Sequence, residues 1–339
     1  MAQTQWYNPT QRRRSDVDLP LELRTVIDTE LAQVPSKRLA TLSADLSERY
    51  RAGRSQAGRA FLRSADDIAA YAAFRLPATF AAVKATLAEI RDQLPHWSPM
   101  SLLDVGAGPG TAMWAATEVW PDLSSVTSLE REEGMISLGR RLAAYSLEAS
   151  VREAKWIKAD ITGAWDVPAH DLVIAAYVLG ELQEPAIQAL VSRMWEATSG
   201  VLVLIEPGTM AGFARIKQAR EQALLLGAKT IAPCPHDDEC PIAGTDWCHF
   251  SQRVARSRLH RQVKAGELAY EDEKFSYVAL SRMPAEPIQG RVLRHPQIGK
   301  GHIRVELCTP TGLKSTVVTR KDKGTFRKAR DLDWGSAVR

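Results

Sequence analysis

Residues 102–111 read LLDVGAGPGT, and this stretch decides the fold of the 339-residue chain. The apolar residues 101–105 predict a strand, the glycine-rich turn ends it, and a helix is expected to follow to about residue 120. Glycines at positions 106, 108 and 110 allow the backbone to approach a ligand closely. Their order is D-x-G-x-G-x-G, which departs from the G-x-G-x-x-G turn that cradles a pyrophosphate in dinucleotide-binding proteins.

Strands and helices alternate through residues 96–230. Further strands are predicted at 125–129, 154–158, 171–176 and 201–205. Helices are predicted to end near residue 145 and to span 184–197 and 210–227. Continuous apolar strands such as 201–205 are typical of parallel sheets that helices cover on both faces. The layout therefore predicts a doubly wound, Rossmann-like α/β core.

The turn resembles motif I of the class I S-adenosylmethionine methyltransferases. The resemblance implies that residues 96–230 bind S-adenosylmethionine (SAM), with Asp104, Gly106, Gly108 and Gly110 at the turn. Glu130 ends the second strand, where a carboxylate can accept the ribose hydroxyls, and Asp160 ends the third, near the expected adenine. Glu130 could instead stabilise a helix start, and Asp160 could be a turn or N-cap residue.

An acceptor site for a methyl group is not evident in the sequence. Residues 175–182 lack the Asn/Asp-Pro-Pro-aromatic loop that often serves methylation of exocyclic base nitrogens. Methylation of pyrimidine C5 needs a cysteine nucleophile, and the cysteines are expected to serve elsewhere. Glu181 and Glu206 are the nearest bases, and a structural role is favoured for each. The sequence leaves methyl transfer open and identifies no catalytic residue.

Three further regions flank this core. Residues 1–20 are expected to be flexible, and residues 21–95 form an Ala-rich helical module in which Pro77 should kink or split a helix. Residues 231–339 form a Cys-rich extension with strands predicted at 275–281, 290–294, 302–307 and 316–320. Residues 251–264 read as a helix with five basic side chains: Arg253, Arg256, Arg258, Arg261 and Lys264.

The four cysteines of the chain point to one metal centre. Cys234, Cys240 and Cys248 lie within fifteen residues and Cys308 lies far downstream, with spacings of x5, x7 and x59. The paired C-x2-C knuckles of a zinc ribbon are missing. An iron–sulfur cube is larger and takes ligands from separated loops, and Cys-Pro occurs in ferredoxin-type ligand loops. A cluster is favoured, while zinc or four unrelated cysteines remain open alternatives.

Basic residues are concentrated at the C-terminus. Residues 290–339 carry twelve Lys and Arg against four Asp and Glu, a net charge of +8, whereas the remainder carries 32 against 36, a net charge of −4. This asymmetry predicts an end that binds a polyanion, with a solvated basic tail as the simpler alternative.

The hydropathy of the chain and the composition of its N-terminus indicate where the protein is located. No apolar run approaches the roughly 18 residues that span a bilayer. Residues 1–20 contain no apolar core for secretion, and Asp16 and Asp18 make them a poor transit peptide. We therefore expect a cytoplasmic protein with no membrane partner, in which reduced thiols favour metal or cluster binding over disulfides.

Six short strings together resemble one family. They are YVLGEL at 177–182, IEPG at 205–208, CPHD at 234–237, WCHF at 247–250, KFSY at 274–277 and GH at 301–302. The family comprises methyltransferase-like proteins associated with the small ribosomal subunit in bacteria and mitochondria. The resemblance covers about residue 46 to the C-terminus.

This resemblance implies an assembly factor that binds small-subunit rRNA, acts on a ribosomal subunit precursor and is a monomer off the ribosome. It also implies a [4Fe–4S] cluster on Cys234, Cys240, Cys248 and Cys308. The first alternative is an active SAM-dependent RNA methyltransferase that uses the same surface. The second is a small-molecule methyltransferase with structural zinc, which the basic C-terminus disfavours.

Overall fold

The computed structural model describes residues 17–32, several positions between 34 and 45, and residues 64–255 and 270–339. The prediction for residues 1–16 lies outside the described residues. So do four members of the predicted basic helix: Arg256, Arg258, Arg261 and Lys264.

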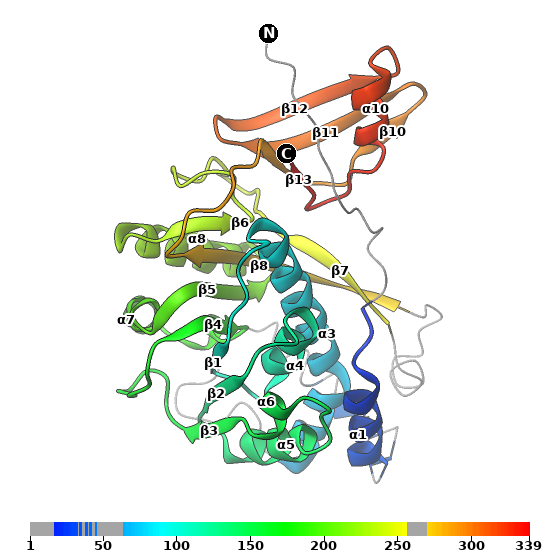
Figure 1. The fold of residues 1–339 in the computed structure, drawn as a ribbon. Helices are drawn as coiled ribbons and strands as arrows, with labels where there is room; N and C mark the ends of the chain where they lie inside the picture. Colours follow the sequence, from blue (N-terminus) through cyan, green and yellow to red (C-terminus); the bar gives the residue numbers. More distant parts are fainter. Residues whose placement is uncertain are drawn as a thin grey trace.

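An eight-stranded sheet forms the centre of the molecule (Figure 1). Its strands follow the order β3-β2-β1-β4-β5-β8-β6, with β7 also paired to β8. The parallel strands are β1 (Ser101–Val105), β2 (Ser125–Glu130), β3 (Lys155–Lys158), β4 (His170–Ala176) and β5 (Thr198–Pro207). The antiparallel strands are β6 (Lys229–Ala232), β7 (Phe250–Ala255) and β8 (Tyr270–Ser281).

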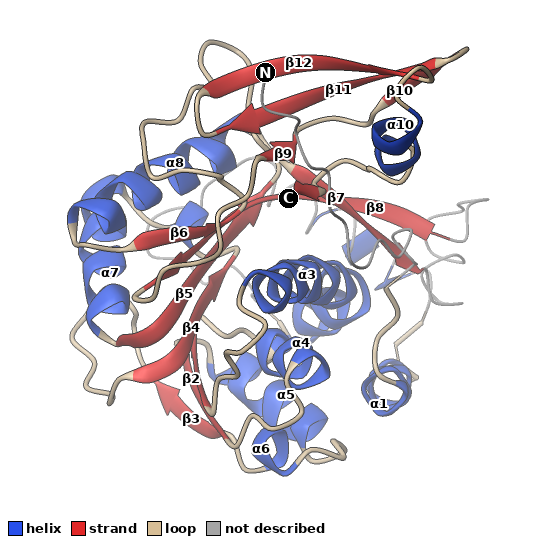
Figure 2. Ribbon diagram, turned by 45° about the horizontal axis from the view of Figure 1, so that its top comes forward, coloured by secondary structure: helices blue, strands red, loops and turns tan. Residues whose placement is uncertain are grey.

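Helices cover both faces of this sheet (Figure 2). One face carries α3 (Ala65–Gln93), α4 (Thr111–Val119), α5 (Glu133–Ala143) and α6 (Ala149–Arg152), and α1 (Leu21–Leu31) packs on α3 and α5. The other face carries α7 (Glu184–Glu196) and α8 (Met210–Leu225), and the short η1 (Leu179–Glu181) follows β4. Adjacent strand residues face opposite cores, as Leu102 and Leu103 do on β1.

This arrangement confirms the predicted fold. The core is that of the class I SAM methyltransferases, with helices before it and a cysteine-containing, strand-rich extension after it. The strand order reverses between β1 and β4, and ligands of open α/β sheets bind at the carboxyl ends of strands at such a point. The glycine turn follows β1 at that position.

The C-terminal extension is divided between two sheets: β7 and β8 complete the main sheet, and the chain from residue 290 onward forms a second, five-stranded sheet. It contains β9 (Gly290–Val292), β10 (Gln297–Gly299), β11 (His302–Thr309), β12 (Gly312–Thr319) and β13 (Ala337–Val338), with α10 (Lys323–Ala329) beside it. Its pairings are antiparallel, and a small core lies between the sheet and α10. Figure 1 shows it stacked over the β6–β8 edge of the main sheet.

Two local predictions are corrected by the structure. The helix α3, which is 29 residues long in all, is not split at Pro77. It runs on through the proline because neighbours such as Leu76 and Phe80 are buried against the core. Residues 250–255 form the strand β7 rather than the start of a helix. Their alternating burial and their pairing with β8 outweigh the helical appearance of a basic segment.

Candidate functional site

The glycine turn has a backbone that requires glycine. Gly106, Gly108 and Gly110 have φ values of 72°, 56° and 79°. A Cβ at Gly106 would lie 2.7 Å from Val178 Cγ2, and the backbone N–H groups of Gly106 and Ala107 donate to the carbonyl of Leu129 at 2.9 Å. The turn is therefore held tightly against the ends of β2 and β4.

Glu130 supports this turn directly. Its Oε2 accepts a hydrogen bond from the Gly108 N–H at 2.7 Å, and its Oε1 accepts from the N–H groups of Arg131 and Glu132 at 2.8 Å each. The carboxylate at the end of β2 thus holds the glycine turn in addition to any ribose contact that its position would allow. The sequence placed Glu130 at this strand end but gave no sign of the bond to Gly108.

Asp104 lies beneath the turn as a buried and incompletely bonded carboxyl group. Only 2% of the residue is exposed, and its Oδ2 has no hydrogen-bond partner. Burial, with a smaller contribution from the charge of Glu130, raises the pKa of Asp104 to about 8. An orphaned carboxyl oxygen here would suit a cationic ligand group such as the ammonium of SAM.

We expect Asp104→Asn to stabilise the ligand-free protein at high pH. The folded pKa of about 8 exceeds the ordinary 3.8, so the native state binds the extra proton and stability falls as pH rises between these values. The neutral amide removes this loss, so the melting-temperature gain of the variant should grow from pH 5 to pH 8. Asp160→Asn is the control, because hydrogen bonds lower the pKa of Asp160. A gain that does not change with pH would contradict the prediction.

Asp160 lies on the same sheet edge as Glu130, since β2 and β3 end side by side. Its side chain is exposed, and Oδ1 accepts hydrogen bonds from Thr162 N at 2.9 Å and Thr162 Oγ1 at 2.7 Å. These bonds lower the pKa of Asp160, so it is a charged turn residue at the end of β3.

Both carboxylate oxygens of Glu206 accept structural hydrogen bonds, which disfavours a role as a general base. It is fully buried, its Oε2 accepts from Arg215 Nε at 2.9 Å, and its Oε1 accepts from Leu179 N at 3.0 Å. It therefore fixes the segment that follows β4.

Tyr177 is a residue that sequence reasoning missed. It directly follows β4 beside the glycine turn, with a φ of 61° that side-chain-bearing residues rarely adopt. Its hydroxyl donates to Glu273 at 2.9 Å, and the guanidinium of Arg75 lies 5.2 Å from its ring centroid. Backbone strain of this kind clusters at ligand sites, although nothing in the local sequence announces it.

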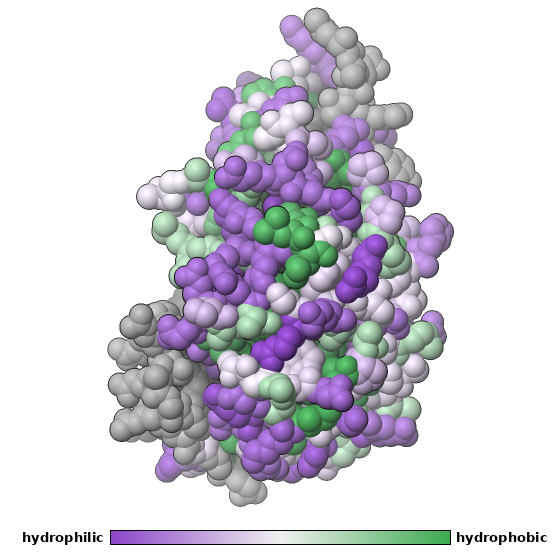
Figure 3. Space-filling model, turned by 90° about the vertical axis from the view of Figure 1, so that its left-hand side faces the viewer, coloured by the Kyte–Doolittle hydropathy of each residue, from purple (hydrophilic) through white to green (hydrophobic). Residues whose placement is uncertain are grey.

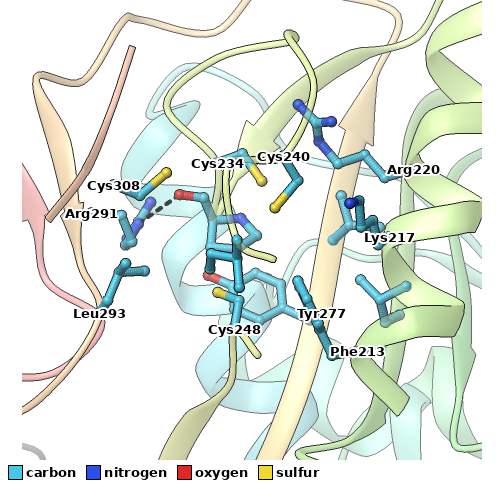
Figure 4. A pocket seen from close by; sticks show the side chains of 14 residues that line it. Phe213, Lys217, Arg220, Cys234, Cys240, Cys248, Tyr277, Arg291, Leu293 and Cys308 are labelled. Atoms are coloured by element: carbon cyan, nitrogen blue, oxygen red, sulfur yellow. Dashed lines mark hydrogen bonds between the residues drawn. The ribbon is translucent and has the colours of Figure 1, made fainter. Parts of the chain in front are cut away.

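The four cysteines line one pocket (Figure 4). Cys234, Cys240 and Cys248 come from the loops between β6 and β7, and Cys308 comes from β11 of the second sheet. The pocket has an empty volume of about 500 Å³, part of it open to solvent, and apolar side chains such as Ile242 and Leu293 complete its walls. Folding has thus gathered thiols that are far apart in the sequence, with 73 residues between Cys234 and Cys308.

Burial and the neighbouring thiols change the pKa values of the cysteines in the pocket. Burial, with smaller contributions from the other cysteines, raises the pKa of Cys308 to about 12 and that of Cys248 well above its usual value. His236 Nε2 lies 3.7 Å from Cys308 Sγ, and its buried Nδ1 has no partner. The thiols of Cys248 and Cys308 would therefore remain protonated unless a cation or cationic core binds them.

The donor atoms of the pocket limit which group it could hold. Within the described ranges, no three or more His, Cys, Asp or Glu side chains lie close enough together to hold a single metal ion. All four thiols nevertheless line the same pocket. The donor set of four cysteines matches the usual ligands of an iron–sulfur cube.

Arg253 does not stand on a basic helix. It projects from β7, where its Nε lies 3.5 Å from Asp272 Oδ1 and its guanidinium lies 3.8 Å from the ring centroid of Tyr270. In the second sheet and around α10, by contrast, many basic side chains are exposed. They are Lys300, Arg304, Lys314, Arg320, Lys321, Lys323, Arg327, Lys328 and Arg330.

An apolar patch lies elsewhere on the surface. Figure 3 shows it as a compact hydrophobic area surrounded by hydrophilic residues, on the face toward which α8 ends. Leu225 at that end is 89% exposed and Leu226 is 46% exposed. Isolated apolar residues are common on protein surfaces, so the patch alone identifies no partner. No described helix is both long and apolar enough to cross a membrane.

Comparison with known proteins identifies the family. Residues 65–339 match the family described as mitochondrial small ribosomal subunit Rsm22. The chain belongs to this family. It is 30% identical over 293 residues to the human mitochondrial ribosome assembly protein METTL17, and 23% identical over 288 residues to the fission yeast Rsm22-cox11 tandem protein 2. These matches cover 79% and 69% of this chain, but only 61% and 38% of the relatives.

Solved structures give weaker likenesses. The magnesium protoporphyrin IX methyltransferase of Synechocystis with bound SAM is 13% identical, with a TM-score of 0.41 over 79% of this chain and 100% of that one. The precorrin-6y C5,15-methyltransferase of Geobacter metallireducens is 15% identical, with a TM-score of 0.39 over 59% and 89%. The fold assignment therefore rests on the strand order described above.

The family match corrects the expected cytoplasmic location. The Rsm22 family and the relatives named above are mitochondrial proteins, so the comparisons point to mitochondria. The cytoplasmic prediction rested on two absences, a recognisable leader in residues 1–20 and an apolar run long enough to span a bilayer. Such an absence is weaker than a positive match over residues 65–339, which contain both the glycine turn and the four cysteines.

Proposed function

We propose that this Rsm22-family protein assists assembly of the small ribosomal subunit, binding its rRNA while carrying SAM and a [4Fe–4S] cluster. The human relative is named as a ribosome assembly protein, which supports the first part. We assign SAM to the glycine turn within residues 96–230, and the cluster and rRNA to residues 231–339. Off the ribosome we propose a monomer.

The convergence of four cysteines on one pocket carries this proposal. When bound, the cluster would supply four iron–thiolate links between the β6–β7 loops and the second sheet. This chain's own residues prepare the site: they provide the thiols, line much of the wall with apolar side chains and place cationic side chains nearby. Anaerobic purification followed by iron, sulfide and zinc analysis tests it, and one zinc without iron would favour the zinc alternative.

SAM binding is supported by the glycine conformations and the orphaned Asp104 oxygen. We expect Glu130→Ala to weaken SAM binding by about 1–3 kcal/mol, because a charged acceptor is lost and the turn loses its bond to Gly108. Calorimetry on the full chain measures this, with Glu132→Ala as the control. If the intact protein binds no SAM, the cofactor assignment fails.

Methyl transfer to RNA is the second candidate. The complete glycine turn and the strained Tyr177 beside it favour an acceptor site at the carboxyl ends of β1 and β4. Labelled SAM incubated with small-subunit rRNA tests for transfer.

RNA binding should depend strongly on salt. We expect alanine replacement of Arg256, Arg258 and Arg261 to weaken rRNA binding and to reduce the salt slope by up to about three phosphate contacts. Alanine replacement of Lys321, Lys323 and Lys328, which are exposed around α10, should have a similar effect. Both measurements are salt titrations of binding to a small-subunit rRNA fragment.

The control for these variants is a triple replacement of exposed basic residues on the main core: Arg91, Arg131 and Arg140. This variant should keep the full affinity and slope, and all three variants should keep SAM binding. Equal losses in all of them would indicate nonspecific attraction by net charge rather than a binding face.

A further inference from the structure

The cysteine pocket carries a positive lining. Of its fourteen lining residues, three are cationic and none is acidic: the cations are Lys217, Arg220 and Arg291. Arg220 is 2% exposed and Arg291 is 1% exposed. Arg291 is paired with the carboxylate of Glu89, whereas burying the guanidinium of Arg220 beside four thiols is unfavourable unless a negatively charged group balances it.

Arg220 is fixed in place while part of it stays unpaired. It projects from α8, and its Nη2 donates to the carbonyls of His236 at 2.6 Å and Asp238 at 3.0 Å, which holds the loop between Cys234 and Cys240. Its Nε and Nη1 are buried without an oxygen or nitrogen partner, although the guanidinium lies close to the thiol of Cys234. Two strong donors are therefore available to a group in the pocket.

Arg291 repeats this arrangement from the opposite side of the pocket (Figure 4). Its Nε donates to the Pro233 carbonyl at 2.9 Å, and its Nη1 donates to Glu89 Oε1 at 2.6 Å and to the Gly335 carbonyl at 2.9 Å. Its Nη2 is buried without a partner. Each arginine is thus fixed by hydrogen bonds to neighbouring groups and has at least one buried N–H donor without a partner.

We propose that Arg220 and Arg291 are positioning residues that donate N–H hydrogen bonds to the sulfur atoms of the group held by the four cysteines, and that their charges set its reduction potential. The inference rests on the proposed cluster. A [4Fe–4S] core with four thiolates is dianionic, and one-electron reduction adds a further negative charge. Two nearby fixed cations and sulfur-directed donors therefore favour the reduced state.

The test is a redox titration of the intact holoprotein with dithionite, followed by electron paramagnetic resonance. Arg220→Gln should lower the midpoint potential so that the ratio of reduced to oxidised cluster at a fixed potential falls at least tenfold, a shift of 59 mV for one electron. Arg220→Lys, which keeps the charge, should show less than half of that shift. Glu89→Gln removes the carboxylate bound to Arg291 and should shift the potential in the opposite direction.

Arg193→Gln is the matched control for a purely structural role. Like Arg220, Arg193 donates to several loop carbonyls, those of Ile161 and Thr162 among them, but it lies outside the pocket. It should leave the potential unchanged. If Arg220→Gln binds the same amount of iron at the wild-type potential, or if Arg193→Gln shifts it equally, the inference is overturned.

Failure of the cluster itself gives a different result. If the purified protein contains zinc and no iron, the proposed cofactor is wrong, and the arginine role is then measured by zinc release to a chelator. Arg220→Gln should release zinc at least tenfold faster than Arg193→Gln, because four thiolates around zinc are also dianionic. Equal release rates would overturn the arginine role in that case as well.

Discussion

Cys308→Ser is expected to lower iron from about four atoms per chain to well below one, and to loosen the second sheet from the core. Cys308 is the only cysteine in that sheet, whereas the other three proposed ligands come from the loops between β6 and β7. Loss of one thiolate from four leaves a cube incompletely ligated. Because metal binding is linked to folding, the C-terminal region should also become more sensitive to protease.

Ile242→Val is the control for this change. Ile242 lines the same pocket within the cysteine loop, and loss of one methyl group should cost only about 0.5–1.5 kcal/mol while all four ligands remain. Iron and sulfide are measured after anaerobic purification, and protease sensitivity is compared by limited proteolysis. Full iron content in Cys308→Ser would show that this thiol is not a ligand.

The second large effect is expected from Arg291→Leu, which should destabilise the protein by about 3–5 kcal/mol. The substitution leaves the carboxylate of Glu89 partly buried without its cation, and it removes hydrogen bonds to the carbonyls of Pro233 and Gly335. This one side chain joins α3, the cysteine loop and the C-terminal segment. The measurement is urea unfolding of the holoprotein followed by circular dichroism.

Two variants separate the causes of that loss. The double replacement of Glu89 and Arg291 by leucine removes both charges and should recover part of the stability, since no buried charge remains unpaired. Arg91→Leu breaks the exposed pair with Asp92 and should change stability by less than about 1 kcal/mol. If Arg291→Leu costs no more than Arg91→Leu, the buried pair does not hold these segments together.

Local patterns in the sequence predicted most of the core. The strands at 101–105, 125–129 and 171–176 and the glycine turn were found from apolar runs and glycine spacing, and the structure has them within one or two residues. Such signals work because a strand covered on both faces must be apolar along its whole length. Local patterns failed at β7, because its conformation depends on pairing with a strand some twenty residues away.

The candidate site was also predicted in part from the sequence and in part only seen in the structure. The composition and spacing of Cys234, Cys240, Cys248 and Cys308 indicated a shared centre, and the D-x-G-x-G-x-G string indicated a ligand turn. Whether the four thiols meet, and what surrounds them, depended on how β11 of the second sheet packs over the main one. The sequence around Arg220 and Arg291 did not predict their place in the pocket, because an arginine that will be buried cannot be told from a surface arginine by its neighbours in the chain.

The sequence by itself therefore determined the doubly wound core, the position of its ligand turn and the residue types available for a metal centre. Only the tertiary structure brought Cys308 to the other thiols, placed two arginines with unpaired donors beside them and tied Glu130 to Gly108. The physical reason is the distance along the chain between the residues that interact. Strand patterns and glycine turns reflect interactions between near neighbours in the chain, whereas a buried site is formed by packing between segments that the sequence keeps far apart.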